Sequence, residues 1–193
     1  MILEDIIISR VRVKVLTLFF TYPGMIFHVR DIVRKVGEEI NAVRRELLHM
    51  EKAGMVAKEQ RANRLFYSFR KDYPLYFDLL QVIGKTSGLG WDLIKHKVKL
   101  GRIKFAMISG RYLRNLPKKS STDVDLLIVG NVVLPELSQL VKAEEVRRER
   151  EINYTVMTEE EFAFRKRRRD PFALSILEGS RVMIIGDEEE LVN

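Results

Sequence analysis

Two aspartates separated by one residue, Asp123 and Asp125, are the side chains of this sequence whose types and spacing point most directly to chemistry. They begin the apolar run at residues 126–129. Residues i and i+2 of a strand point to the same face, so we expect both carboxylates to project together from one strand end. Neighbouring carboxylates repel each other unless a cation lies between them, and Mg²⁺ is the usual cation for such ligands. The alternative is a buried strand with a polar start and no metal.

The surroundings of this pair resemble a known superfamily. A strand predicted at residues 103–108 ends in Ser109-Gly110, shortly before the segment STDVDLLIVG at residues 121–130. This order resembles the nucleotidyltransferases of the DNA polymerase beta type, in which a glycine-containing turn binds phosphates and the strand aspartates hold Mg²⁺. The resemblance implies a nucleoside triphosphate ligand contacted by Ser109, Gly110 and Arg111, and metal ligation and catalysis by Asp123 and Asp125.

Two departures from that pattern argue against catalysis. Gly110 is followed by Arg111, where the family has serine, and Asn153 stands where the family has a third carboxylate. An amide is a neutral ligand and a poor base. Glu151, two residues earlier, is the substitute for this third catalytic carboxylate if the site is active. The resemblance therefore implies a degenerate domain with a regulatory, ligand-sensing or dimerising role, and Mg²⁺ that binds weakly without nucleotide.

The composition limits the class of protein. The chain has 193 residues, of which 46% are hydrophobic, it has no cysteine, and its formal net charge is +7. Most of the positive excess lies before Thr86, where 15 bases face 10 acids, against 19 and 17 from there on. This excess favours a phosphate-bearing partner. The first residues carry acids, and the apolar runs fall short of the ~18 residues of a membrane span, so we expect a cytoplasmic protein that contacts no membrane.

The first 86 residues predict helices followed by a hairpin. A first helix follows Ser9 as N-cap and ends at residues 22–24, a second covers residues 29–36 before Gly37, and a third covers residues 40–53. Residues 55–60 and 65–69 alternate as two strands around a tip at residues 61–64, where Asn63 suits a left-handed turn position. A further helix is predicted at residues 75–83, where it packs on this domain or supplies a dimer contact.

The third helix has two different faces. At about 100° per residue, Ile40, Val43, Leu47 and Met50 form an apolar stripe, and polar and basic residues gather opposite. The segment at residues 10–69 resembles winged-helix transcriptional regulators of the arsenic-repressor-like group. The resemblance implies that this helix enters the major groove of double-stranded DNA and that the hairpin follows the backbone. The alternative is a solvated charged face. The candidate DNA-binding residues are Asn41, Arg44, Arg45, His49, Lys52, Lys58, Arg61 and Arg64.

Residues 85–90 are the predicted linker, which gives an N-terminal domain at residues 1–86 and a second domain at 87–193. In the second domain we expect a short helix at 91–99, a basic loop at 111–122, and strands at 103–108, 124–129, 152–157 and 182–185. Helices are expected at 134–145, after Thr158 as part of a capping box, and at 171–177. The fold class is therefore α/β (α+β), with a winged helix-turn-helix before a mixed-sheet nucleotidyltransferase-like domain. The basic run at residues 165–169 either binds nucleic acid or complements a helix dipole.

Together these features predict a DNA-binding transcriptional regulator, acting as a homodimer, with a nucleotidyltransferase-like second domain. The alternative is an active Mg²⁺-dependent nucleotidyltransferase that modifies a protein or a small molecule. A third possibility is membership of a toxin–antitoxin pair, because minimal nucleotidyltransferases pair with small helical toxins.

Overall fold

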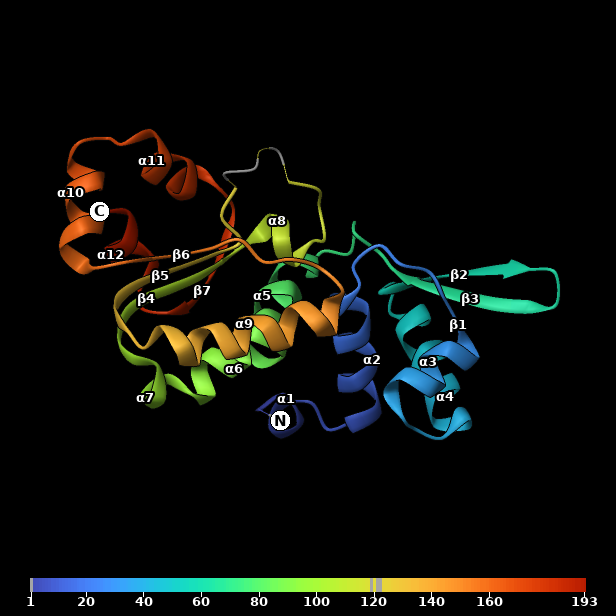
Figure 1. Cartoon of the computed structure of the whole chain (residues 1–193). Helices are drawn as coiled ribbons and strands as arrows, with labels where there is room; N and C mark the ends of the chain where they lie inside the picture. The colour runs from blue at the N-terminus through green and yellow to red at the C-terminus, as the bar shows by residue number, and fades with distance from the viewer. Residues whose placement is uncertain (1, 119, 121–122) are drawn as a thin grey trace. The chain divides into compact units, whose positions relative to one another are not determined.

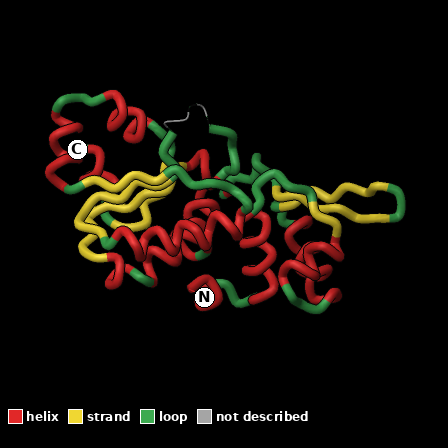
Figure 2. The backbone as a smooth tube through the Cα atoms, viewed as in Figure 1, coloured by secondary structure: helices red, strands yellow, loops and turns green. Residues whose placement is uncertain are grey.

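The computed structural model describes residues 2–118, 120 and 123–193. Ser121 and Thr122 of the aspartate motif, and Lys119 of the predicted basic loop, lie outside the described residues. The described chain is mixed α/β, with twelve helices and two sheets of three and four strands (Figures 1 and 2). It divides into two compact units, Met1–Thr86 and Ser87–Asn193. None of its described helices has both the length and the apolar character needed to cross a membrane.

The first unit consists of helices with one small antiparallel sheet, in the order β1-β3-β2. Register is regular along the β2–β3 hairpin, from the Val56–Phe69 pair to the Arg61–Arg64 pair. The elements are α1 (Ile2–Ile6), α2 (Arg10–Thr21), β1 (Phe27–His28), α3 (Val29–Val36), α4 (Ile40–Lys52), β2 (Val56–Arg61), β3 (Arg64–Phe69) and α5 (Tyr76–Thr86).

Local chemistry sets the limits of these helices. The Ser9 hydroxyl accepts a hydrogen bond from the Arg12 amide at the start of α2, and Gly37 ends α3 in the left-handed region at φ 65°, as predicted. At the start of α4 the Glu39 carboxylate accepts from two amides of the first turn. The left-handed residue of the hairpin tip is Ala62, at φ 50°. The prediction that Asn63 takes that conformation was therefore wrong, because of the two loop residues only Ala62 has a positive φ.

The core of the first unit forms where α2, α3 and α4 meet. Val13, Ile32, Val43 and Leu47 are fully buried there. Aromatic rings extend this core toward the hairpin and α5, with the Phe20 and Phe69 ring centres 4.8 Å apart. The apolar stripe predicted for α4 is confirmed at Val43, Leu47 and Met50, and Ile40 is half-buried. Burying this stripe leaves the opposite side of α4 for solvent or a partner.

The second unit is built on the four-stranded sheet, in the order β6-β5-β4-β7. β5 and β6 run parallel, and β4 is antiparallel to both β5 and β7. The elements are α6 (Gly88–Lys95), α7 (Lys97–Leu100), β4 (Gly101–Ser109), α8 (Gly110–Leu113), β5 (Leu126–Val132), α9 (Leu134–Arg148), β6 (Tyr154–Met157), α10 (Glu159–Arg167), α11 (Pro171–Glu178), β7 (Arg181–Ile185) and α12 (Glu188–Val192).

Helices cover both faces of this sheet. Figure 1 shows α6, α7 and α9 along one face, and α10, α11 and α12 gathered at the other. Phe105, Leu127 and Met157 of three neighbouring strands form a buried cluster with Phe162 of α10 and Ile176 of α11. Alternation along the strands sends every second apolar residue to the opposite face, which explains the near-continuous apolar runs of β4 and β5. The order of the strands brings the end of β4 and the starts of β5 and β6 to one edge.

Several predicted boundaries were wrong. Residues 85–90 are not a linker, because α5 runs to Thr86 and α6 begins at Gly88, with only Ser87 between them. Gly88 has φ 56°, and a Cβ on it would lie 2.9 Å from the Glu144 Oε1 atom. The glycine therefore allows the Glu144 side chain to lie close to the main chain at the start of α6. The predicted helix at 91–99 is broken at His96 between α6 and α7.

The predicted basic loop at 111–122 starts as the short helix α8, in which Tyr112 and Leu113 are buried. Its first turn is capped by the Ser109 hydroxyl, which accepts from the Arg111 amide at 3.2 Å. The basic residues around Tyr112 and Leu113 favoured the prediction of an exposed loop and obscured the short helix. At the other predicted helix start, Thr158 caps α10 by accepting from the Glu161 amide, as expected for one half of the capping box.

Candidate functional site

The first region with functional side chains is the exposed side of α4. Arg44, Arg45 and His49 are all exposed, as are Asn41 and Lys52. Within the described part of the chain, neither Arg44 nor Arg45 has an ion pair or a side-chain hydrogen bond. Two guanidinium groups presented in this way on one helix suit a polyanionic partner, because their donors are not occupied by the protein itself.

A groove connects this helix with the hairpin. It is lined by residues of α3, α4 and β3 that include Arg30, Arg44 and Arg64, and its volume is about 650 Å³. Leu48 is 50% exposed and Leu65 is 39% exposed beside these arginines. A groove lined by basic and apolar side chains matches a sugar–phosphate backbone, whose phosphates are anionic and whose sugars offer carbon surface. Arg30 was missed by the sequence analysis, since it lies on another helix and only the packing of α3 against the hairpin brings it here.

Two of the remaining predicted DNA contacts, Lys58 and Arg61, have partners in the chain. Lys58 lies 3.0 Å from a Glu51 carboxylate oxygen, and the Arg61 Nε donates to Glu59 at 2.8 Å. The Glu51 hydrogen bond raises the pKa of Lys58. Exposed ion pairs of this kind contribute little to stability because water screens them, so a phosphate can replace the carboxylates. Arg64, in contrast, has no ion pair among the described residues.

The buried side of α4 carries one acid that the sequence analysis missed. Glu46 is 8% exposed, accepts from the Ser9 hydroxyl at 2.6 Å and accepts from the Arg12 Nε at 2.8 Å. Burial alone would raise the pKa of Glu46, but the hydrogen bonds from Ser9 and Arg12 outweigh burial and lower it. These bonds fix α4 to α2, and so they orient the exposed arginines of the helix.

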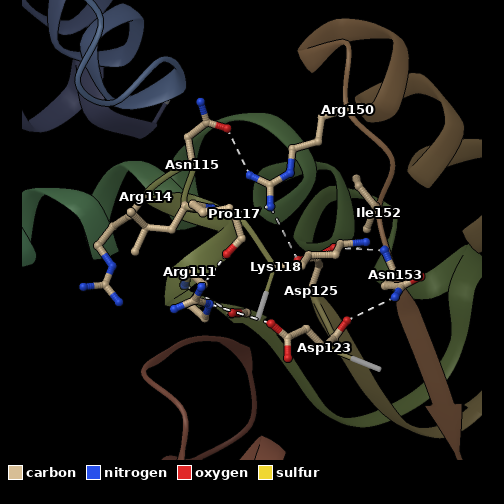
Figure 3. Close-up of polar contacts among 12 residues, drawn as sticks. Arg111, Arg114, Asn115, Pro117, Lys118, Asp123, Asp125, Arg150, Ile152 and Asn153 are labelled. Atoms are coloured by element: carbon tan, nitrogen blue, oxygen red, sulfur yellow. Dashed lines mark hydrogen bonds and ion pairs between the residues drawn. The ribbon is translucent and has the colours of Figure 1, made fainter. Parts of the chain in front are cut away.

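The second region is a cavity of about 270 Å³ at the sheet edge where β4 ends and β5 and β6 begin. Its polar lining comes from both sides of the predicted aspartate motif, as Figure 3 shows for the central residues. The floor is apolar and includes Met107 and Ile176. The charged and hydroxyl residues around it are Ser109, Arg111, Arg114, Lys118, Asp123, Asp125, Arg150, Ser175, Glu178 and Ser180.

Asp125 is the buried acid of this cavity, with only 2% exposure. Its Oδ2 atom accepts from the Asn153 amide at 3.0 Å and lies 3.4 Å from the Lys118 Nζ. Its Oδ1 atom lies 4.0 Å from the Arg150 Nη2. The strand predicted from residue 124 starts at Leu126, so Asp125 precedes β5, although its amide donates to the Asn153 carbonyl at 2.7 Å.

Asp123 lies at the same cavity but is partly exposed. Its Oδ2 atom is 3.8 Å from the Arg111 Nε, and its carbonyl accepts from the Asn153 Nδ2 at 3.2 Å (Figure 3). The structure thus brings Asp123, Asp125 and Asn153 together. Glu151 is exposed and lines a different depression, beside Asn115 and Pro117.

The arginines of the cavity are held by neutral acceptors. The Arg150 guanidinium donates to the Asn115 Oδ1 at 3.0 Å and to the Leu116 carbonyl at 3.1 Å, and that of Arg111 donates to the Pro117 carbonyl. The Tyr112 ring lies 5.0 Å from the Arg150 guanidinium, and burial raises the pKa of the tyrosine hydroxyl. Neutral acceptors fix a guanidinium group without cancelling its charge.

The predicted phosphate turn at Ser109-Gly110 has a structural use. The Gly110 amide donates to the Ser180 carbonyl at 2.7 Å, and the Arg111 amide donates to the Ser109 hydroxyl. A Cβ on Gly110 would lie 2.5 Å from the Ser180 Oγ. Both amides of this turn therefore donate inside the protein, and the glycine allows the close approach of β7. The side chains of Ser109 and Arg111 still face the cavity.

Comparison with known proteins adds no assignment, since no family model, curated protein or solved structure matches this chain. The described residues also contain no group of three or more His, Cys, Asp and Glu side chains arranged to hold a metal ion. Mg²⁺ and a nucleoside triphosphate stay predictions. The two candidate sites are the α4–hairpin surface and the cavity at Asp125.

Proposed function

We propose that this protein is a DNA-binding transcriptional regulator whose first unit is a winged helix-turn-helix and whose second unit is a nucleotidyltransferase-like domain with a sensing or dimerising role. The observation that carries the proposal is the exposed side of α4. Arg44 and Arg45 stand there without ion pairs among the described residues, next to the groove that Arg30 and Arg64 line.

Three features support α4 as the helix that enters the major groove. Its apolar stripe is buried against α2 and α3, so the polar side faces outward. The Glu46 contacts with Ser9 and Arg12 fix the rotation of the helix about its axis. The hairpin follows directly and carries Arg64 into the same groove. A major groove about 12 Å wide accepts one helix, and arginine pairs bidentately with guanine there.

The decisive experiment measures the affinity for fluorescein-labelled duplex DNA of mixed sequence as a function of salt. Loss of Arg44 and Arg45 in one double alanine variant should weaken binding at low salt by at least tenfold. Arg70→Ala is the matched single control, because Arg70 is exposed but pairs with Asp72 at 2.6 Å. Equal affinity of the double variant and the unmodified protein for every duplex would remove the major-groove assignment.

A second candidate function is nucleotidyl transfer by the second unit. It is favoured by one observation, which is that Ser109, Asp123 and Asp125 line the same cavity. Incubation with labelled nucleoside triphosphates, Mg²⁺ and a cell extract tests it. Label on any protein or small molecule that disappears in Asp125→Asn would make this the primary function, and a co-purifying small helical protein would place it in a toxin–antitoxin pair.

A further inference from the structure

We propose that the cavity beside Asp123 and Asp125 binds a small phosphate-bearing anion directly through Arg111, Lys118 and Arg150, without Mg²⁺. The inference rests on the proposed sensing role of the second unit, and it does not depend on DNA binding. It departs from what the nucleotidyltransferase resemblance implies, because side chains of the protein take the place of the metal.

The environment of the two aspartates does not fit Mg²⁺. This ion requires near-octahedral oxygen ligands at about 2.0–2.1 Å. The Asp125 Oδ2 already accepts from an amide and has the Lys118 ammonium at 3.4 Å, and the Asp123 Oδ2 has the Arg111 Nε at 3.8 Å. Cationic side chains therefore stand where the metal would bind. Asn153 adds no third carboxylate, and its amide donates to the Asp123 carbonyl.

The same cations remain able to bind a ligand. Their distances to the aspartates, 3.4–4.0 Å, exceed the roughly 2.7–2.9 Å of a charge-assisted hydrogen bond. The direct hydrogen bonds of Arg111 and Arg150 go instead to carbonyl and amide oxygens. The Arg111 Nε is buried and has no hydrogen-bond partner among the described residues. A donor left in this way beside a cavity is satisfied when an acceptor enters it.

Two hydroxyls extend the set of donors. The Ser109 hydroxyl accepts from the Arg111 amide at 3.2 Å, and the Ser180 hydroxyl accepts from the Arg114 Nη2 at 2.9 Å. Each hydroxyl has one proton to donate, and no acceptor for either proton is present in the described part of the chain. Donors from several directions suit the tetrahedral oxygens of a phosphate better than a carboxylate, whose acceptor sites all lie in one plane.

The size of the cavity limits the ligand. Its volume, about 270 Å³, lies just below the ~300–1,000 Å³ of pockets that enclose drug-sized ligands. Four basic side chains and three acidic ones line it, so the lining has a formal excess of one positive charge, which favours an anion. We therefore assign a phosphate monoester or pyrophosphate group as the part of the ligand that this cavity encloses.

The test is isothermal titration of the full-length protein with inorganic pyrophosphate, first in EDTA and then in Mg²⁺. Binding should occur in EDTA and should weaken about tenfold in Lys118→Gln and in Arg111→Gln, the loss of one charge-assisted hydrogen bond in each case. Lys142→Gln and Arg102→Gln are the matched controls, since both residues are exposed and lie outside the cavity lining. Thermal unfolding of each variant verifies that it is folded.

Asp123→Asn separates this proposal from a metal site. Removing a negative charge beside the anion should tighten pyrophosphate binding in EDTA by about fivefold, whereas a metal site would lose its ligand. Binding that appears only with Mg²⁺ and disappears in Asp123→Asn would overturn the proposal, and so would a lack of binding in EDTA. If pyrophosphate binds but leaves the DNA affinity unchanged, the sensing role fails and the anion site stands.

Discussion

Arginine is used in opposite ways in the two functional regions. On α4, Arg44 and Arg45 extend into solvent with no ion pair among the described residues, beside the open groove of about 650 Å³. In the second unit, Arg111 and Arg150 point into a cavity of about 270 Å³ and are fixed by main-chain carbonyls. Fixed guanidinium groups cost little entropy on binding, whereas exposed ones must be ordered by the ligand. The first arrangement suits an extended polyanion and the second a small anion.

The buried acids of the two regions, Glu46 and Asp125, also differ in how they contact their cations. Glu46 lies underneath α4 and makes direct hydrogen bonds, so it is part of the scaffold. Asp125 is more deeply buried and accepts a hydrogen bond from the Asn153 amide, but it keeps its cations, Lys118 and Arg150, at 3.4 and 4.0 Å. At these distances the carboxylate attracts the two cations without a direct hydrogen bond, so it keeps them beside the cavity and leaves their donors available. This difference between scaffold and cavity can be tested by substitution.

The largest effect is expected for Asp125→Ala. This change leaves the Asn153 amide without its acceptor and two cations without their counter-charge, which should lower the free energy of unfolding by about 2–3 kcal/mol. Urea denaturation measures it. Asp125→Asn keeps an acceptor for the amide and should cost less than half as much. Equal losses in both variants would mean that charge alone matters, and that the hydrogen bond to Asn153 contributes nothing.

For Arg45→Ala we expect a loss of about 1–3 kcal/mol in the free energy of DNA binding if Arg45 contacts a base edge, with weaker preference at that base pair. Competition with duplexes that differ at single positions measures the preference. A phosphate contact would instead reduce the affinity for all sequences about equally. A loss of thermal stability in this variant would contradict the picture of a free, exposed arginine.

At the hairpin, Arg64→Ala should reduce the slope of log affinity against log salt by roughly one unit, because one phosphate contact is lost. Arg61→Ala should reduce it less, since Arg61 already donates to Glu59. The slopes come from anisotropy titrations at several salt concentrations. A change in sequence preference with an unchanged slope would show that the hairpin contacts bases.

The smallest effect concerns the pH dependence of stability. The pKa of Glu46 is lowered in the folded state, so its contribution is present above the unfolded pKa and is lost as the pH falls through the folded value. Stability should therefore decline between about pH 5 and pH 3 in the unmodified protein, and it should decline less in Glu46→Gln. Denaturant titrations across this range measure the difference. An identical decline in both proteins would mean that other carboxylates carry the acid sensitivity.

Much of the secondary structure followed from the sequence alone. Helix limits set by Ser9, Gly37 and Thr158 and the apolar stripe of α4 depend on contacts within a few residues. The same holds for the pairing of β2 with β3 across a two-residue loop. Such signals depend on residues that are close in sequence, so they can be recognised without knowledge of the tertiary structure. The mixed α/β class, the exposed side of α4 and the proximity of Asp123 to Asp125 were therefore predictable.

Only the tertiary structure decided how those residues are used. Gly110 is a glycine because Ser180, just before β7, approaches it, with the Ser180 Oγ 2.5 Å from where its Cβ would be, and no local pattern reveals that contact. Arg30 reaches the groove through the packing of α3, and Arg150 reaches Asp125 from beyond α9. The sequence specified charges and their spacing along the chain. Contacts between distant segments, such as those of Arg150 with Asn115 and Leu116, distinguish the held arginines of the cavity from the exposed arginines of α4.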